Sequence, residues 1–378
     1  MKSNLNILVI FISLFFSFIS SYAQIDNAPF YRFQSIHEEN TENLYLSISH
    51  LSFNKDNEYF NKIADGYTLF GNQLTTSLVY FPVANVRIEG GIYLRKDFGN
   101  SNYAEIAPVF SVKYQHNNMA LIFGTLEGSL NHNLVEPLYD FEKIMLDKNE
   151  NGIQFLLNKQ NLSLDAWINW EKMLYRGDSV QEKVSGGLSS EYKIIHSEKY
   201  NVSVPVQFTA MHLGGQIDAS DLPLTTKFNS AFGLKTGMNF NHTFFKGIYF
   251  EPYYLYYKDF SFEYQDAFQD GDGIYLNLSL KTKLNTIMVS YWNGNEYIST
   301  HGGLLYNSRS TTFKNPDYTE TKRELLILRF LTDIEIFKGL DITSRFEPFY
   351  DVTNKKIEFS LGLYINYNDD FFLKKLKQ

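Results

Sequence analysis

The stretch SHLSFN contains a histidine and a serine that could together cleave an ester bond. His50 and Ser52 are two positions apart, so both side chains lie on one face if this stretch forms a β-strand. An imidazole within hydrogen-bond reach of a hydroxyl can take its proton and so produce a nucleophile. Asn72, in the next extended stretch, could orient the imidazole. Whether these side chains meet depends on the elements that carry them.

Alternation of apolar and polar residues dominates the chain from Asn43 onward. In KIEFSLGLYINY, residues 356–367, every second side chain is apolar and those between are mostly polar. The same period of two occurs in residues 86–95, 162–174 and 200–210. Alternation over such lengths predicts β-strands with one face in an apolar environment.

The breaks between these strands alternate between short turns and longer loops. The short polar breaks are residues 82–85, 115–118, 158–161, 197–200, 244–247, 281–284 and 337–340. The longer polar segments are residues 54–66, 97–103, 131–151, 176–181, 214–226, 264–272, 297–320 and 352–355. Bacterial outer-membrane barrels have short periplasmic turns, longer outer loops and strands of about 10 residues.

We therefore predict an all-β fold, a transmembrane antiparallel β-barrel of about 16 strands, with 14 or 18 as the alternatives. Such a sheet must close, because backbone groups in hydrocarbon have to be paired. A soluble exported β-sandwich or β-helix would also alternate. The aromatic content of 17% and the rhythm of the turns favour the membrane barrel.

The N-terminus has the anatomy of a secretory signal peptide. Lys2 precedes an apolar run from Leu5 to Ile19, and small residues stand at Ser21 and Ala23. We expect a signal peptide over residues 1–23, a periplasmic segment over 24–42, the barrel over 43–368 and a C-terminal tail over 369–378.

The composition excludes several classes of function. The chain has no cysteine, so neither disulfides nor thiolate metal sites are expected. The net charge of −8 gives no sign of a nucleic-acid partner. The eight histidines are scattered without metal-ligand spacing, so we expect no metal and no cofactor.

The last strand resembles the terminal assembly signal of bacterial outer-membrane barrels. Its residues are Ser360, Gly362, Ile365 and Tyr367. The resemblance implies a location in the outer membrane, contact with its lipid, and recognition by the barrel-assembly machinery. The pattern usually ends the chain, whereas a tail, NDDFFLKKLKQ, follows here. The signal peptide ending in Ala-Gln and the Tyr- and Asn-rich strands resemble barrels of Bacteroidetes-type bacteria.

A barrel of about 16 strands is wide enough for an aqueous lumen, which predicts a porin-like channel for passive diffusion of small hydrophilic solutes. Charged residues with inward parity are candidates for selectivity: Arg87, Glu89, Arg95, Asp165, Glu171, Lys183, Lys235, Arg345, Glu347 and Glu358. The alternative is that these charges pair across neighbouring strands. A homo-oligomer, as in porins, is possible.

The segment over residues 131–151 mixes acids with apolar residues. It is similar in position and composition to the third loop of porins, which narrows the lumen. We predict an acidic constriction at Glu136, Asp140 and Glu142, with a helical cap over the rim as the alternative.

Two other functions compete with the channel. Outer-membrane phospholipases carry a similar His-x-Ser pair on a lipid-facing strand, and His50, Ser52 and Asn72 have outward parity. Phe53 interrupts the flanking Ser-Asn-Gly pattern of that family, so we expect these residues not to be catalytic and the chain not to be an enzyme. The third candidate is a docking barrel that binds a partner or glycan through residues 131–151 and 297–320.

Overall fold

The computed structural model describes residues 27–376, except 31–32, 34, 216 and 218. The predicted signal peptide lies outside the described residues. The first strands are β1 (Asn43–Glu58), β2 (Thr68–Val83), β3 (Val86–Asp97), β4 (Glu105–His116), β5 (Met119–Thr125), β6 (Asn151–Asn158), β7 (Leu162–Lys172) and β8 (Lys183–His196). They are followed by β9 (Tyr200–Leu213), β10 (Thr225–Gly233), β11 (Lys235–Asn239), β12 (Phe245–Asp259), β13 (Asp270–Thr282), β14 (Thr286–Asn295), β15 (Lys322–Phe337), β16 (Leu340–Asp351) and β17 (Lys356–Lys375).

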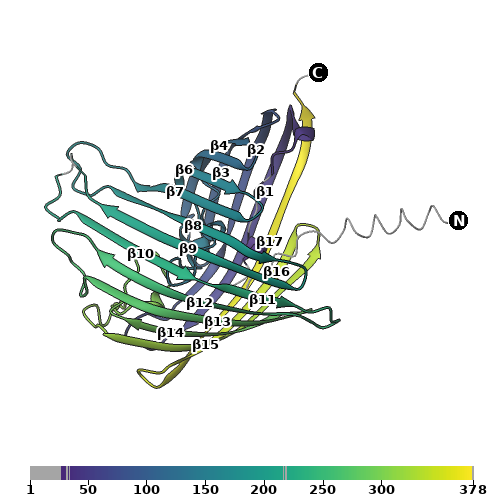
Figure 1. Cartoon of the computed structure of the whole chain (residues 1–378). Helices are drawn as coiled ribbons and strands as arrows, with labels where there is room; N and C mark the ends of the chain where they lie inside the picture. The colour runs from purple at the N-terminus through teal and green to yellow at the C-terminus, as the bar shows by residue number, and fades with distance from the viewer. Residues whose placement is uncertain (1–26, 31–32, 34, 216, 218, 377–378) are drawn as a thin grey trace.

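These strands form one closed antiparallel sheet (Figure 1). Each strand pairs with its neighbours in the chain, and β1 closes the cylinder by pairing with both β2 and β17. Strands β10 and β11 are interrupted only at Leu234, and both pair with β9 and β12, so they cross the wall as one. The described part of the chain therefore crosses the wall 16 times, which confirms the predicted barrel and strand number.

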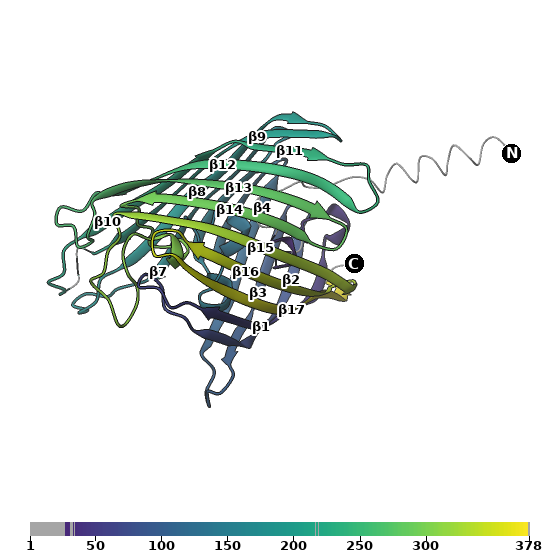
Figure 2. The same ribbon diagram turned by 90° about the horizontal axis from the view of Figure 1, so that it is seen from below.

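Long loops and short turns lie at opposite ends of the barrel. Strand β1 begins where β17 ends, because Asn43 pairs with Lys375. The C-terminal end lies opposite the longer loops in both views (Figures 1 and 2). By the rule for such barrels, the end with the short turns is periplasmic.

The two faces of the wall have inverted polarity compared with a soluble protein. On β17, Leu361 and Leu363 are each 50% exposed, whereas Glu358 and Ser360, on the other face, are 2% exposed. A wall with apolar residues outside and polar residues inside is the pattern of a transmembrane barrel. Ser360 and Gly362 of the predicted assembly signal thus point inward, and Ile365 and Tyr367 point outward.

The expected C-terminal tail is wrong over most of its length. Residues 369–375 continue β17 and pair with the first residues of β1, and the rings of Phe372 and Tyr45 lie 5.7 Å apart. The sequence hid this because Asn368, Asp369 and Asp370 interrupt the alternation. The backbone of β1 still offers hydrogen-bond partners there, and pairing depends on the backbone rather than on side-chain polarity.

Helices are short in the described residues. They are η1 (Ala28–Phe30), η2 (Glu38–Asn40), η3 (Ser129–His132), α2 (Lys143–Leu146) and η4 (Leu304–Tyr306). None of them has the length and apolar character to cross a membrane.

The barrel interior contains an apolar cluster, which the sequence did not predict. Leu134, Val135 and Leu138 of the long connection between β5 and β6 pack against Tyr297 and Ile298 of the connection between β14 and β15. Inward side chains of the wall complete it: Trp167, Tyr253, Tyr275, Trp292, Leu325 and Ile327. Side chains therefore occupy this cross-section of the expected aqueous lumen.

Candidate functional site

The three residues with potential ester chemistry meet on the outer face of the wall. His50 Nε2 and Ser52 Oγ are 3.4 Å apart. Asn72 on β2 lies directly opposite Ser52 in the register and diagonally opposite His50. Inward-facing Leu51 and Phe53 are buried, so the alternation leaves His50 and Ser52 on the outer face. Parity alone therefore placed these side chains correctly.

The surroundings of this group are apolar. Ser52 lies between Asn72 and Ile365, and His50 lies between Leu74 and Tyr367. Asn72 is in the half of β2 that is nearer to its outer end. The group thus faces lipid on the outer side of the membrane midplane. Placing a polar base and a hydroxyl at such a depth in the membrane costs free energy. Polar side chains retained there therefore indicate a functional site.

The connection over residues 126–150, here called the lumen loop, runs through the barrel interior. On one side, Gln73 of β2 donates from Nε2 to the carbonyl oxygens of Ile144 and Met145 at 2.9 Å. On the other side, the Gln207 side chain of β9 accepts from Val135 N at 2.9 Å. Contacts with distant strands therefore fix the loop across the lumen.

Two of the three predicted constriction carboxylates are held by cations of the wall. Glu136 pairs with Arg329 and accepts hydrogen bonds from Tyr306 at 2.7 Å and Tyr275 at 2.9 Å. Burial alone would raise the pKa of Glu136, but the charge of Arg329 outweighs it and lowers the pKa. The carboxylate therefore anchors the loop to the wall. Removing one partner of a buried ion pair lowers the free energy of unfolding by several kcal/mol.

Glu142 is anchored in the same way at β1. Its Oε1 accepts from Lys55 at 2.6 Å and from Asn57 at 2.7 Å. Burial opposes ionisation, but Lys55 outweighs it and lowers the pKa of Glu142. The Asp140 carboxylate accepts a hydrogen bond from the backbone N–H of Glu142, at 3.0 Å. Burial, followed by the charge of Glu142, raises the pKa of Asp140 to about 7.

The predicted lumen charges do face inward, and each has a close partner. Arg87 pairs with Glu127 at 3.0 Å, Asp165 with His132 at 2.8 Å, and Lys235 with Glu191 at 2.8 Å. The remaining contacts are Glu89–Ser77, Arg95–Asp97, Glu171–Lys183, Arg345–Asn27, Glu347–Arg329 and Glu358–Asn61. Several of these partners lie in loops, and the alternation of strand residues does not predict the positions of loop side chains.

His132 is an interior site that the sequence analysis missed. It is completely buried in η3, and its ring stacks on Trp167 at a centroid distance of 3.5 Å. Its two ring nitrogens lie 2.7 Å from Glu150 and 2.8 Å from Asp165. Burial lowers the pKa of His132, but the two carboxylates outweigh it and raise it to about 9. A protonated imidazole thus ties the lumen loop to β7.

We expect the lumen loop to loosen when His132 loses its proton. Its folded pKa lies above the unfolded value of about 6.5, so the stabilisation is full below that pH and is lost as the pH rises through about 9. Proteolysis of the loop in detergent should be on the order of tenfold faster at about pH 10 than at about pH 6. Equal rates would contradict this assignment, and His132→Gln should remove the pH dependence.

The described residues contain no group of three or more His, Asp or Glu side chains arranged to hold a metal ion.

The docking hypothesis also loses its main argument. Large parts of segments 131–151 and 297–320 pack against each other inside the barrel, where Tyr306 is 4% exposed. Most side chains of residues 297–310 are engaged in the interior, whereas Phe313 is 93% exposed.

Comparisons with known proteins connect this barrel to an enzyme family. The lipid A 3'-O-deacylase-type family model matches residues 36–376. No curated protein shows a significant sequence match to this chain.

Among solved structures, the outer-membrane protein OprD from Pseudomonas aeruginosa is similar, with a TM-score of 0.53 and 12% identity. That match covers 88% of this chain and 95% of OprD. A loop-deletion mutant of OmpT from Vibrio cholerae has a TM-score of 0.50 and 9% identity, over 86% of this chain and 99% of its own. At these identities the likeness shows the fold alone, an outer-membrane β-barrel.

The expectation that the chain is not an enzyme is wrong, because the matching family model is that of a deacylase-type family. That expectation rested on the interruption by Phe53 of the Ser-Asn-Gly pattern that flanks the His-x-Ser pair in outer-membrane phospholipases. The predicted location in the bacterial outer membrane is confirmed by the barrel and its structural relatives.

Proposed function

This chain belongs to the lipid A 3'-O-deacylase-type family, and we propose that it hydrolyses the acyl ester on the 3' oxygen of lipid A. The observation that carries the proposal is the outward-facing pair of His50 and Ser52, with 3.4 Å between Nε2 and Oγ. A hydrogen bond of this length is loose, and such bonds commonly tighten only when substrate binds.

In the first step, Ser52 Oγ attacks the carbonyl carbon of the ester, and its proton passes to His50 Nε2. The tetrahedral intermediate collapses when the bond between the carbonyl carbon and the sugar oxygen breaks. The imidazolium of His50 gives its proton to that oxygen, so the sugar hydroxyl leaves neutral and the acyl group stays on Ser52.

In the second step, a water molecule replaces the sugar. His50 takes a proton from the water, the hydroxide attacks the acyl carbon, and the bond to Ser52 Oγ breaks. The proton returns to Ser52, and the fatty acid leaves. The outer ends of β1 and β2 supply a polar path for this water, since Asn54 and Asp56 continue the outward series of β1 toward the loops.

The position on the wall suits a lipid substrate. Leu363 and Ile365 on β17 and Phe70 on β2 flank the group and are between 39% and 50% exposed. An acyl chain can therefore lie along the barrel with its ester next to Ser52 without leaving the bilayer. A soluble ester would have to enter hydrocarbon to reach the same atoms.

Asn72 is proposed as the positioning residue of the group. It lies opposite Ser52, and its side-chain amide makes no hydrogen bond with the part of the chain described here, so the amide is available to the imidazole or to the developing oxyanion. Asn72→Ala should lower the deacylation rate by about 10- to 100-fold without changing the fold. A rate within about twofold of wild type would exclude this role.

The direct test is mass spectrometry of lipid A incubated with the purified chain in detergent micelles. We expect a product that lacks the 3'-O-linked acyl chain, together with one equivalent of free fatty acid. If lipid A stays intact and no fatty acid appears, the proposal fails.

Passive diffusion of small hydrophilic solutes is the competing function. The lumen loop weighs against it, because its ion pairs at Arg329 and Lys55 and its apolar cluster occupy the same cross-section. Recognition by the assembly machinery and a homo-oligomeric state stay predictions from the sequence.

A further inference from the structure

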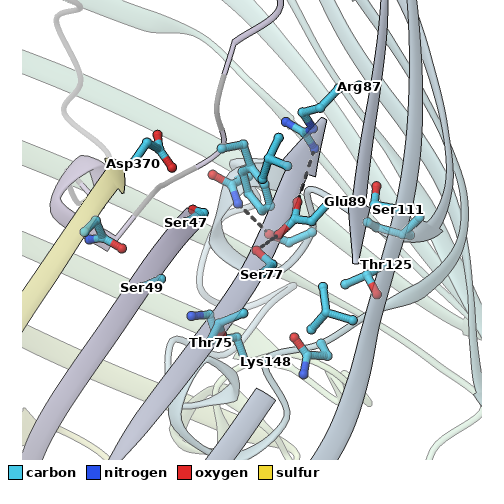
Figure 3. Close-up of a pocket in the computed structure, with 18 of the residues that line it drawn as sticks. Ser47, Ser49, Thr75, Ser77, Arg87, Glu89, Ser111, Thr125, Lys148 and Asp370 are labelled. Atoms are coloured by element: carbon cyan, nitrogen blue, oxygen red, sulfur yellow. Dashed lines mark hydrogen bonds and ion pairs between the residues drawn. The ribbon is translucent and has the colours of Figure 1, made fainter. Parts of the chain in front are cut away.

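A cavity of about 430 Å³ lies inside the barrel, between the inner faces of the first strands and the lumen loop (Figure 3). It is on the other side of the wall from His50 and Ser52. Six hydroxyl-bearing side chains of the strands line it: Ser47, Ser49, Thr75, Ser77, Ser111 and Thr125. Its rim includes His37, Asn40 and Asp370, which places the opening at the periplasmic end.

Lys148 of the lumen loop brings a positive charge to this cavity (Figure 3). Its ammonium group forms no ion pair or hydrogen bond with any residue that the structure describes. Burial lowers the pKa of Lys148 to about 8, with no carboxylate contributing in the opposite direction. The group is therefore still mostly protonated at neutral pH, and its side chain is only partly exposed.

Further polar atoms on the cavity lining lack hydrogen-bond partners within the described residues. They include Ser111 Oγ, on a side chain that is 2% exposed, and Asn149 Nδ2. Buried polar atoms in native structures nearly always have a partner, so such atoms point to a bound molecule or to ordered water. Both can donate a hydrogen bond, as can the ammonium of Lys148.

Glu89, a carboxylate of the cavity lining, is already engaged. Glu89 accepts a hydrogen bond from Ser77 at 2.7 Å and lies 3.9 Å from Arg87, as the dashed lines in Figure 3 show. Asp369 and Asp370 lie at the rim, on the last part of β17. Lys148 is thus a cation on the cavity lining without a carboxylate partner, while the negative charges are paired or stand at the rim.

We propose that this cavity binds a small polyhydroxylated organic anion, whose carboxylate or phosphate pairs with Lys148 and whose hydroxyls bond the serine and threonine side chains. A volume of about 430 Å³ is within the range of small-molecule sites and would otherwise need roughly 14 waters at about 30 Å³ each. The site opens to the periplasm and is separate from lipid hydrolysis at the outer wall.

The test is titration calorimetry of the full chain in detergent with gluconate, with sorbitol as the neutral analogue of nearly the same shape, and with inorganic phosphate. We expect gluconate to bind at least about tenfold more tightly than either sorbitol or phosphate. Lys148→Gln should weaken gluconate binding at least about tenfold. Lys143→Gln, on the same loop but outside the cavity and paired with Asp147 at 3.2 Å, should not.

Ser111→Leu keeps the charge of Lys148 but fills the cavity, so it should also abolish gluconate binding; it serves if Lys148→Gln does not fold. The absence of gluconate binding, or equal binding by Lys148→Gln, would mean that the cavity holds water only. Sorbitol binding as tight as gluconate would overturn the role of the charge, and phosphate binding as tight would overturn the role of the hydroxyls. None of these results depends on deacylase activity.

Discussion

Replacing Ser52 by alanine is expected to reduce the release of fatty acid from lipid A by about 1,000-fold or more. The change removes the oxygen that becomes acylated, while the rest of the wall stays in place. Ser52 is on the outer face, and within the described residues its hydroxyl forms a hydrogen bond only with His50. Alanine therefore leaves no buried partner unsatisfied. The measurement is the initial rate of fatty acid release in mixed micelles.

Thr76→Val is the matched control for this variant. Thr76 also carries a hydroxyl on the outer face of the wall, four residues from Asn72 along β2, and it pairs with Ile48. Its loss should leave the rate unchanged. His50→Ala should match Ser52→Ala, because a base and a nucleophile that act as one unit give similar losses alone and together. A Ser52→Ala protein that retains deacylase activity would move the chemistry to another part of the molecule.

The strand faces and the outer-wall group were predictable because both depend on a period of two. Parity places Ser52 beside Asn72 once β1 and β2 are paired, and it separates Leu361 from Glu358 on β17. Closure of the sheet then follows from the need to pair every backbone group in hydrocarbon. Strand parity and the pairing of neighbouring strands can therefore be read from the sequence alone.

The interior was not predictable by the same rules. Glu136 meets Arg329 across 193 positions, and His132 meets Asp165 across 33. No repeat or motif marks these pairs, since the lumen loop takes its conformation from contacts with distant strands. Lys148 became visible only when the loop was placed, because its significance is the lack of a partner and not its residue type.

Removing the lumen loop should convert the barrel into an open pore. Replacing residues 131–147 by a short glycine-rich turn removes Glu136, Phe141 and Glu142, which bridge the loop to the wall. We expect single-channel conductance in planar bilayers to rise at least about tenfold over wild type, because a barrel of 16 strands is wide enough for an aqueous channel once it is unfilled.

The opened pore should also prefer anions. The deletion frees Lys55 and Arg345 and also frees Asp165 and Glu150 from His132. The removed residues carry four carboxylates against only Lys143 and His132, so the net charge of the lumen becomes more positive. A reversal potential in a KCl gradient measures this preference, since rings of cationic side chains favour anions.

Deletion of residues 176–181, an outer loop with mostly exposed side chains, is the control and should leave conductance at the wild-type level. If the longer deletion does not fold, Glu142→Lys serves instead. The introduced ammonium would lie beside that of Lys55, and the repulsion between them would push the loop from the wall. A wild-type barrel that already conducts as well as the deletion would show that the lumen loop does not close the pore, and would restore passive diffusion as the leading function.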